Sequence, residues 1–130
     1  MKKLIAVCLS ALLCAALLAG CGGGLSDAYD EEKVVSLAHE VVTDLNNNDY
    51  DAVVAMMNDT MKAALPTDKL SEAWAPVSEQ LGAFDSFVKD ATSEKDSIAT
   101  IVVLAKYANA NLTFTISFNT DLQLVGLYMK

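Results

Sequence analysis

Residue types that carry chemistry in proteins are scarce in this chain of 130 residues, which has one histidine, three cysteines and no arginine. A histidine that acts as a base or a metal ligand needs partners, and a zinc site takes several nitrogen, sulfur or carboxylate ligands. With a single imidazole, only a carboxylate-rich site remains, and no sequence motif supplies one. His39 is therefore interpreted first as a half-exposed helix residue, and second as a base or ligand at the mouth of a cavity.

The three cysteines all lie in an N-terminal stretch that has the composition of a secretory signal. Lys2 and Lys3 precede an apolar run over residues 4–19, and small residues stand just before Cys21. A basic start, an apolar middle and a small-residue end are typical of a cleaved signal. The apolar run is short for a membrane-spanning helix, which needs about 20 such residues.

The end of this stretch, Leu18-Ala19-Gly20-Cys21, resembles the lipobox of bacterial lipoproteins. The resemblance implies that residues 1–20 are removed as a lipoprotein signal peptide, and that Cys21 is diacylated on its sulfur and becomes the first mature residue. Acyl chains contribute about 0.8 kcal/mol per buried methylene, so two or three chains anchor a protein stably. The domain would then sit at the outer face of the cell membrane. Since Cys8 and Cys14 leave with the signal, thiol catalysis and cysteine metal sites are not expected.

The net charge of the chain limits the classes of partner that it is expected to bind. The chain has a net charge of −8, and loss of Lys2 and Lys3 would leave seven basic residues against 17 acidic ones, a net charge of −10. Nucleic acid requires a basic patch, which this composition does not predict. Anionic lipid headgroups are expected to repel so acidic a domain, whereas a cationic ligand is compatible with its charge.

The mature chain is predicted to be one domain that begins with helices. Residues 21–29 are interpreted as the lipidated cysteine and a flexible spacer, and residues 30–130 as a single domain. Apolar residues recur at intervals of three and four in the first helical segment, which predicts an amphipathic helix. Three helices are expected: one over about 27–46, a short one from Tyr50 after the cap Asp49, and one over about 68–81 capped by Thr67 and ended by Gly82.

From residue 83 the hydrophobic period changes to that of strands, predicted over 83–90, 98–108, 112–119 and 122–128. The clearest signal is the strict alternation of Leu112, Phe114, Ile116 and Phe118 with Thr113, Thr115, Ser117 and Asn119. Such alternation predicts one face on a core and the other toward solvent or a polar partner. Phe84 and Phe87 would share a face only if a bulge separates them. Helices followed by strands with short turns predict an α+β domain.

Short motifs run along nearly the whole mature chain: Asn48-Asp49-Tyr50, Met61-Lys62, Ala64-Leu65-Pro66, Leu70, Trp74, Leu81-Gly82-Ala83-Phe84, Phe118-Asn119 and Val125-Gly126-Leu127. In this order and spacing they resemble the domain of unknown function 3887 (DUF3887) family, found in exported bacterial lipoproteins. The order of elements also resembles the nuclear transport factor 2-like, or cystatin-like, fold. That fold implies N-terminal helices packed on a curved antiparallel four-stranded sheet. The family implies a fold and a location, but no activity.

The resemblance also implies where a cavity would lie, between the helices and the sheet. Some enzymes of this fold use an acid and a tyrosine there for proton transfer at a carbonyl-activated carbon. The candidate cavity-lining residues in this chain are His39, Trp74, Tyr107, Phe114, Phe118 and Tyr128. A plain hydrophobic core would use the same aromatic residues, and no acid is clearly placed on the inner face. No nucleophile elbow, phosphate loop or metalloprotease motif is present, so no catalytic residue, metal or cofactor is predicted.

The leading expectation is therefore a membrane-anchored, extracytoplasmic protein that binds a small ligand or an envelope partner without catalysis. An enzyme with a ketosteroid-isomerase-like cavity is one alternative, and a purely structural interaction domain is another. The polar strand face of Thr113, Thr115, Ser117 and Asn119 is a candidate homodimer contact, because dimers are common on the fold that the sequence resembles. Plain solvation of this face is the competing interpretation.

Overall fold

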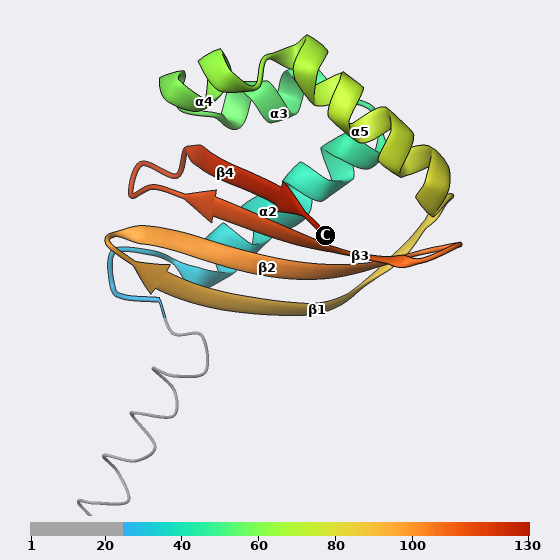
Figure 1. Cartoon of the computed structure of the whole chain (residues 1–130). Coiled ribbons are helices and arrows are strands. Elements are labelled where there is room, and N and C mark those ends of the chain that lie inside the picture. The colour runs from blue at the N-terminus through green and yellow to red at the C-terminus, as the bar shows by residue number, and fades with distance from the viewer. Residues whose placement is uncertain (1–24) are drawn as a thin grey trace, which may run out of the picture.

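The computed structural model describes residues 25–130, so the predicted signal peptide and Cys21 lie outside the described residues. In the described part, four helices come first: α2 (Glu31–Asn46), α3 (Tyr50–Met56), α4 (Asp59–Ala64) and α5 (Thr67–Leu81). Four strands follow, β1 (Phe84–Lys95), β2 (Ile98–Tyr107), β3 (Asn111–Phe118) and β4 (Leu124–Met129). They form one antiparallel sheet in the order β1-β2-β3-β4, and the helices gather over one face of its curve (Figure 1). The predicted α+β class is confirmed.

The first helix, α2, begins later than its hydrophobic pattern predicts. Asp30 acts as the N-cap, accepting a hydrogen bond from the Lys33 amide (3.4 Å), so the helix starts at Glu31 instead of near residue 27. The residues before the cap lie beside the β1–β2 hairpin, where the Tyr29 hydroxyl donates to the carbonyl of Ser97 (2.5 Å), and the same hydroxyl lies 3.2 Å from the carbonyl of Phe118 at the end of β3. The apolar stripe of α2 is buried as its spacing predicts: Val34, Ala38, Val41, Val42 and Leu45.

The ends of the remaining helices follow local capping chemistry, with one correction. Asp49 accepts a hydrogen bond from the Ala52 amide (3.3 Å), which confirms it as the cap of α3. Thr67 does not cap α5, because it is the first residue of that helix and its hydroxyl donates to Asp51 (3.1 Å). Gly82 ends α5 with a φ of 77°, in the left-handed region that glycine tolerates best.

Strand β1 is longer than predicted because its hairpin is tighter. Lys95 still pairs with Ile98, so the turn is only Asp96 and Ser97, with φ of 52° and 65°. Two central residues with positive φ form a turn whose backbone twist matches the twist of the two strands that it joins. The strand therefore ends at residue 95, not at residue 90 as predicted.

Two bulges shape the start of β1. Register shifts fall between Phe84 and Ser86 and between Phe87 and Lys89. A bulge adds a residue to one strand without moving its partner, so side chains that plain alternation would separate can share a face. Phe84 and Phe87 do share one, with ring centroids 5.1 Å apart. The sequence left it open whether a bulge separates these two residues, and the structure has one between Phe84 and Ser86.

The core fills the space between the helices and the inner face of the sheet. In β3, alternate residues from Leu112 to Phe118 are buried, which confirms the predicted alternation. Trp74 of α5 packs against this layer, with its ring centroid 5.9 Å from that of Phe114. No helix within residues 25–130 is long and apolar enough to cross a membrane.

Candidate functional site

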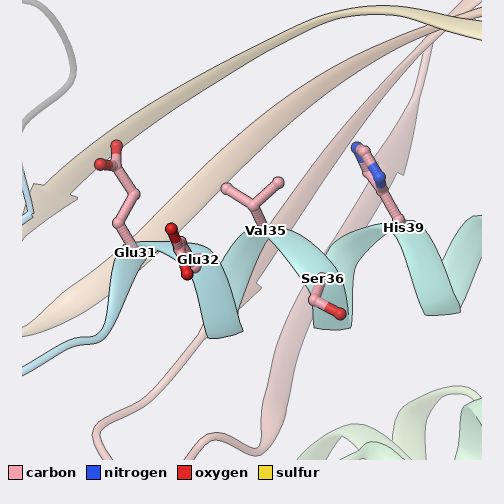
Figure 2. A pocket seen from close by; sticks show the side chains of 5 residues that line it. All are labelled: Glu31, Glu32, Val35, Ser36 and His39. Atoms are coloured by element: carbon pink, nitrogen blue, oxygen red, sulfur yellow. The ribbon is translucent and has the colours of Figure 1, made fainter.

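A groove between helix α2 and the edge strand β1 contains the single histidine of the chain. Glu31, Val35 and His39 are spaced four residues apart, so they form one stripe along α2, beside its buried stripe. Figure 2 shows these three side chains extending from the same side of the helix. This stripe, together with Glu32, Ser36 and the facing residues of β1, is called the α2–β1 groove below.

The facing residues of β1 are set by the sheet register. Phe87 pairs with Ala105, Asp90 with Val103, and Thr92 with Ile101. Directly opposite residues in an antiparallel pair share a face of the sheet, and all three partners on β2 are buried under the helices. Phe87, Asp90 and Thr92 therefore point to the helix side of the sheet, where α2 crosses it.

Three contacts join the two walls of the groove. The Thr92 hydroxyl donates a hydrogen bond to Glu31 Oε1 (2.8 Å). His39 Nε2 lies 2.8 Å from Asp90 Oδ1, and the imidazole stacks on Phe87 with centroids 3.9 Å apart and planes 7° from parallel. An ionised carboxylate can only accept, so Nε2–H of His39 donates to it. The stack and the hydrogen bond together fix the imidazole plane, which a lone surface histidine would leave free.

Beside these contacts lies a solvent-open pocket of about 480 Å³, and the five residues that line it all belong to α2: Glu31, Glu32, Val35, Ser36 and His39. The side chains of His39 and Asp90 are each 29% exposed, and His39 lines the pocket, so a ligand there can reach the imidazole. Two carboxylates, an imidazole and one apolar side chain favour a ligand that carries a positive charge or hydrogen-bond donors beside a small apolar part. Ser36 lines the same pocket but points away from His39 in Figure 2.

The predicted cavity-lining residues do not gather around one cavity. Trp74, Phe114 and Phe118 are fully buried, and Tyr107 is nearly so, all within the core cluster. His39 lies outside the core in the α2–β1 groove. Tyr128 is 71% exposed and lines a different surface pocket of about 290 Å³, together with residues of α4 and β4.

Tyr107 is the one predicted residue with a buried hydroxyl. The hydroxyl donates to Asn46 Oδ1 (2.6 Å), and burial raises the pKa of Tyr107 to about 12. A proton-transfer site of the ketosteroid-isomerase kind needs an acid beside such a hydroxyl. Here the hydrogen-bond partner of the hydroxyl is a neutral amide, and the bond joins α2 to the sheet. The Trp74 Nε1 atom is buried without a hydrogen-bond partner.

The polar face of β3 lies on the side of the sheet away from the helices. Thr113, Thr115, Ser117 and Asn119 are half-buried rather than fully exposed, because side chains of neighbouring strands stand beside them. Thr100 and Ser117 form a cross-strand hydroxyl pair with oxygens 3.1 Å apart. Within residues 25–130, no three histidine, cysteine, aspartate or glutamate side chains are grouped so that they could hold a metal ion.

Sequence reasoning missed the residues that give His39 its environment. Asp90 is 51 positions away along the chain, and Phe87 and Asp90 face α2 only because of the register of β1. Asp44 was missed as well: its pKa is raised, first by burial and then by the nearby carboxylates of Glu40 and Asp49. The Glu40–Asp44 spacing of four on a predicted helix was the available signal for that repulsion.

Comparisons with known proteins agree with this architecture. A family model described as "Protein of unknown function (DUF3887)" matches residues 38–127. The NMR structure of a protein from Ruminococcus gnavus ATCC 29149 is similar, with a TM-score of 0.69 and 21% sequence identity. The match covers 81% of this chain and 95% of that one, and at this identity it shows the fold alone. The comparison with curated proteins gives no match.

Proposed function

The chain belongs to the DUF3887 family, whose function is unknown, and we propose that it is an exported lipoprotein that binds a small cationic ligand without catalysis. Lipid on Cys21 holds the domain at the outer face of the cell membrane. The ligand occupies the α2–β1 groove. The observation that carries the proposal is the imidazole of His39, which is held by Asp90 and Phe87 and lines a pocket of about 480 Å³ together with two carboxylates.

The groove suits binding because its recognition groups are fixed before a ligand arrives. His39 is held by Asp90 and Phe87, and Glu31 is held by Thr92. Groups that are already ordered lose little conformational entropy on binding. Glu32 lines the same pocket and adds a second carboxylate that a cation could contact. An amine or amidine beside a flat apolar group matches this arrangement.

Membrane anchoring is tested on Cys21 directly. The protein is purified from host membranes in mild detergent, and the mass of its N-terminal peptide is measured. We expect a diacylglyceryl-modified Cys21 as the first residue. The Cys21→Ser variant should appear in the soluble fraction, or as an uncleaved precursor without lipid. An unmodified Cys21 in the membrane-bound protein would contradict the anchor.

Ligand binding is tested on the same detergent-extracted protein by native mass spectrometry. A retained small molecule should be lost from Glu32→Gln and His39→Gln but kept by Glu72→Gln, which removes an exposed carboxylate on α5, outside the groove. Loss from all three variants alike would indicate a non-specific effect of charge. A consistently ligand-free mass, with no binding of an amine library to the wild-type protein, would refute the binding role.

A further inference from the structure

The face of the sheet away from the helices carries a charge opposite to that of the whole domain. We define the outer sheet face by the residues that the register places there. One cross-strand row is Lys89, Leu104, Thr113 and Lys130; the next is Ala91, Val102, Thr115 and Tyr128; the third is Ser93, Thr100, Ser117 and Gly126. Lys106 and Lys95 stand at the two ends of these rows, paired with Ser86 and Ile98.

No paired residue on this face of the described sheet is acidic, although the chain has 17 acidic residues. Four of the seven lysines within residues 25–130 lie on it. The helices, on the other side, hold nine of the carboxylates and the remaining three lysines. Asp85 is an unpaired bulge residue at the edge, beside the start of β1. The net charge of the domain therefore does not reveal that lysines predominate on the outer sheet face and carboxylates on the helices.

The outer sheet face also exposes apolar surface. Tyr128 is 71% exposed, and Val88, the bulge residue beside Lys89, is 53% exposed. Between them, Ala91, Val102 and Leu104 line a shallow pocket of about 270 Å³ with Lys89 and Thr113. Lysines around tyrosine and aliphatic side chains are the composition of surfaces that rest on membrane interfaces, because lysine stems lie on apolar groups while ammonium ions reach phosphates.

The position of the chain start fits the same partner. Both the amide and the hydroxyl of Ser26 donate to Glu94 Oε1 (2.9 and 2.7 Å), so the described chain starts at the β1–β2 hairpin. Four residue steps separate Cys21 from Leu25, which span at most about 14 Å when extended. A lipid on Cys21 would thus keep this end of the sheet close to the bilayer. Figure 1 shows the hairpin at one end of the long β1 and β2 strands.

We propose that the outer sheet face docks on the anionic phospholipid surface to which the chain is anchored, turning the acidic helices and the α2–β1 groove away from the membrane. The proposal rests on the lipid anchor proposed above. Charge complementarity acts over about 8 Å at physiological salt, so the four lysines meet the lipid while the carboxylates of the helices are largely screened. Each lysine near an anionic surface shifts the docked-to-undocked ratio roughly fivefold. The lipid anchor keeps the outer sheet face at a high local concentration beside the bilayer, so a weak attraction between this face and the lipid is sufficient for docking.

The test places a fluorophore on each face of the lipidated full-length protein. In the mature protein the sulfur of Cys21 is acylated, so Ser93→Cys on the outer sheet face and Ala73→Cys on α5 each provide one labelling site. The proteins are reconstituted into vesicles that contain a headgroup-attached quencher, made either with phosphatidylglycerol and phosphatidylcholine or with phosphatidylcholine alone. We expect the label at Ser93 to be quenched several-fold more in the anionic vesicles, and to recover in high salt. The label at Ala73 should remain unquenched in both.

Matched variants separate docking from anchoring. Replacing Lys89, Lys106 and Lys130 together by glutamine should reduce the docked-to-undocked ratio on the order of a hundredfold. The control replaces Lys33, Lys62 and Lys69 of the helices, which removes the same charge and should leave quenching unchanged. Flotation of the vesicles in high salt reports the lipid anchor alone.

Three results would overturn the docking. The first is a protein that floats with the vesicles while both labels are quenched equally. The second is an equal effect of the two triple variants. The third is disulfide crosslinking between Ser93→Cys copies that is independent of lipid charge, which would assign this face to a second copy of the chain. Failure to float would instead refute the anchor.

Discussion

Replacing Tyr107 by phenylalanine tests whether its buried hydroxyl is an uncharged structural donor. The hydroxyl donates to Asn46 and so joins α2 to β2, while the ring centroid lies 6.5 Å from that of Trp74 on α5. Near pH 8 the variant loses one side-chain hydrogen bond. We therefore expect its free energy of unfolding to be lower by about 1 kcal/mol.

Because Tyr107 can ionise at high pH, we expect the wild type, but not Tyr107→Phe, to lose the stability that depends on its neutral hydroxyl. Burial raises the pKa of Tyr107 from 10.0 to about 12, so the folded state resists ionisation that the unfolded chain permits. The resulting stability is fully present below pH 10 and is lost as the pH rises through 12. A shift of two pKa units corresponds to at most about 2.7 kcal/mol, and about half of this is lost by pH 11. The wild type and Tyr107→Phe should therefore become equally stable near pH 11.

The assay is urea unfolding of both proteins between pH 8 and 11.5, followed by circular dichroism. Lysine deprotonation and changes in net charge affect both proteins, so the difference in free energy isolates Tyr107. Tyr128→Phe is the matched control, because Tyr128 is exposed and its hydroxyl has no hydrogen bond in the described structure. That variant should follow the wild type at every pH. Parallel curves for Tyr107→Phe and the wild type, with no convergence up to pH 11.5, would refute the reasoning.

Three further substitutions test the packing and the chain start. Phe114→Ala should lower the free energy of unfolding by about 3–5 kcal/mol in urea, because it empties a fully buried site; a cost below about 1 kcal/mol would contradict the core described here. Gly82→Ala should cost about 1–3 kcal/mol by thermal unfolding, because φ is 77° and the new Cβ would lie 3.1 Å from Asn109 Nδ2; an unchanged melting temperature would count against the cap. Hydrogen bonds from Ser26 lower the pKa of Glu94, so their stabilising effect is present above the ordinary value of 4.5 and is lost as the pH falls through the lowered one. The protection factor of the Ser26 amide, which is the intrinsic exchange rate at each pH divided by the observed rate, should therefore fall in acid and in Glu94→Gln at neutral pH, and an equal protection factor in that variant and the wild type would exclude the contact.

The periodic part of the fold could be predicted because it depends on local patterns. The stripe of α2 and the alternation in β3 each repeat with the period of their own element, so the residues themselves indicate which side is buried. The relation between Phe84 and Phe87 even indicated where a bulge was needed. Boundaries were less reliable, since they depend on competing partners: Asp30 captures the start of α2, and the hydroxyl of Thr67 bonds to Asp51 instead of capping α5.

The candidate site was harder to predict because its members are distant along the chain. His39 was singled out as the single histidine, but its partners Phe87 and Asp90 depend on where the bulges of β1 lie. A single-residue change of register would turn Asp90 to the other face. The six predicted cavity residues could be chosen for their chemistry, yet their placement in the core, in the groove or on the outer sheet face required the tertiary structure.

The order of helices and strands, the family resemblance, the scarcity of catalytic side chains and the net charge all follow from the amino-acid sequence. Each of these is a property of composition or of local period, so it does not depend on which segments meet. The contacts between residues that are distant along the chain follow from the folded structure. In the folded structure His39 stacks on Phe87 and contacts Asp90, and the hydroxyl of Tyr107 donates to an amide. Lys89, Lys106 and Lys130 lie on one face of an acidic domain. The physical reason is that strand pairing and helix packing join residues tens of positions apart, through a register that no local pattern contains.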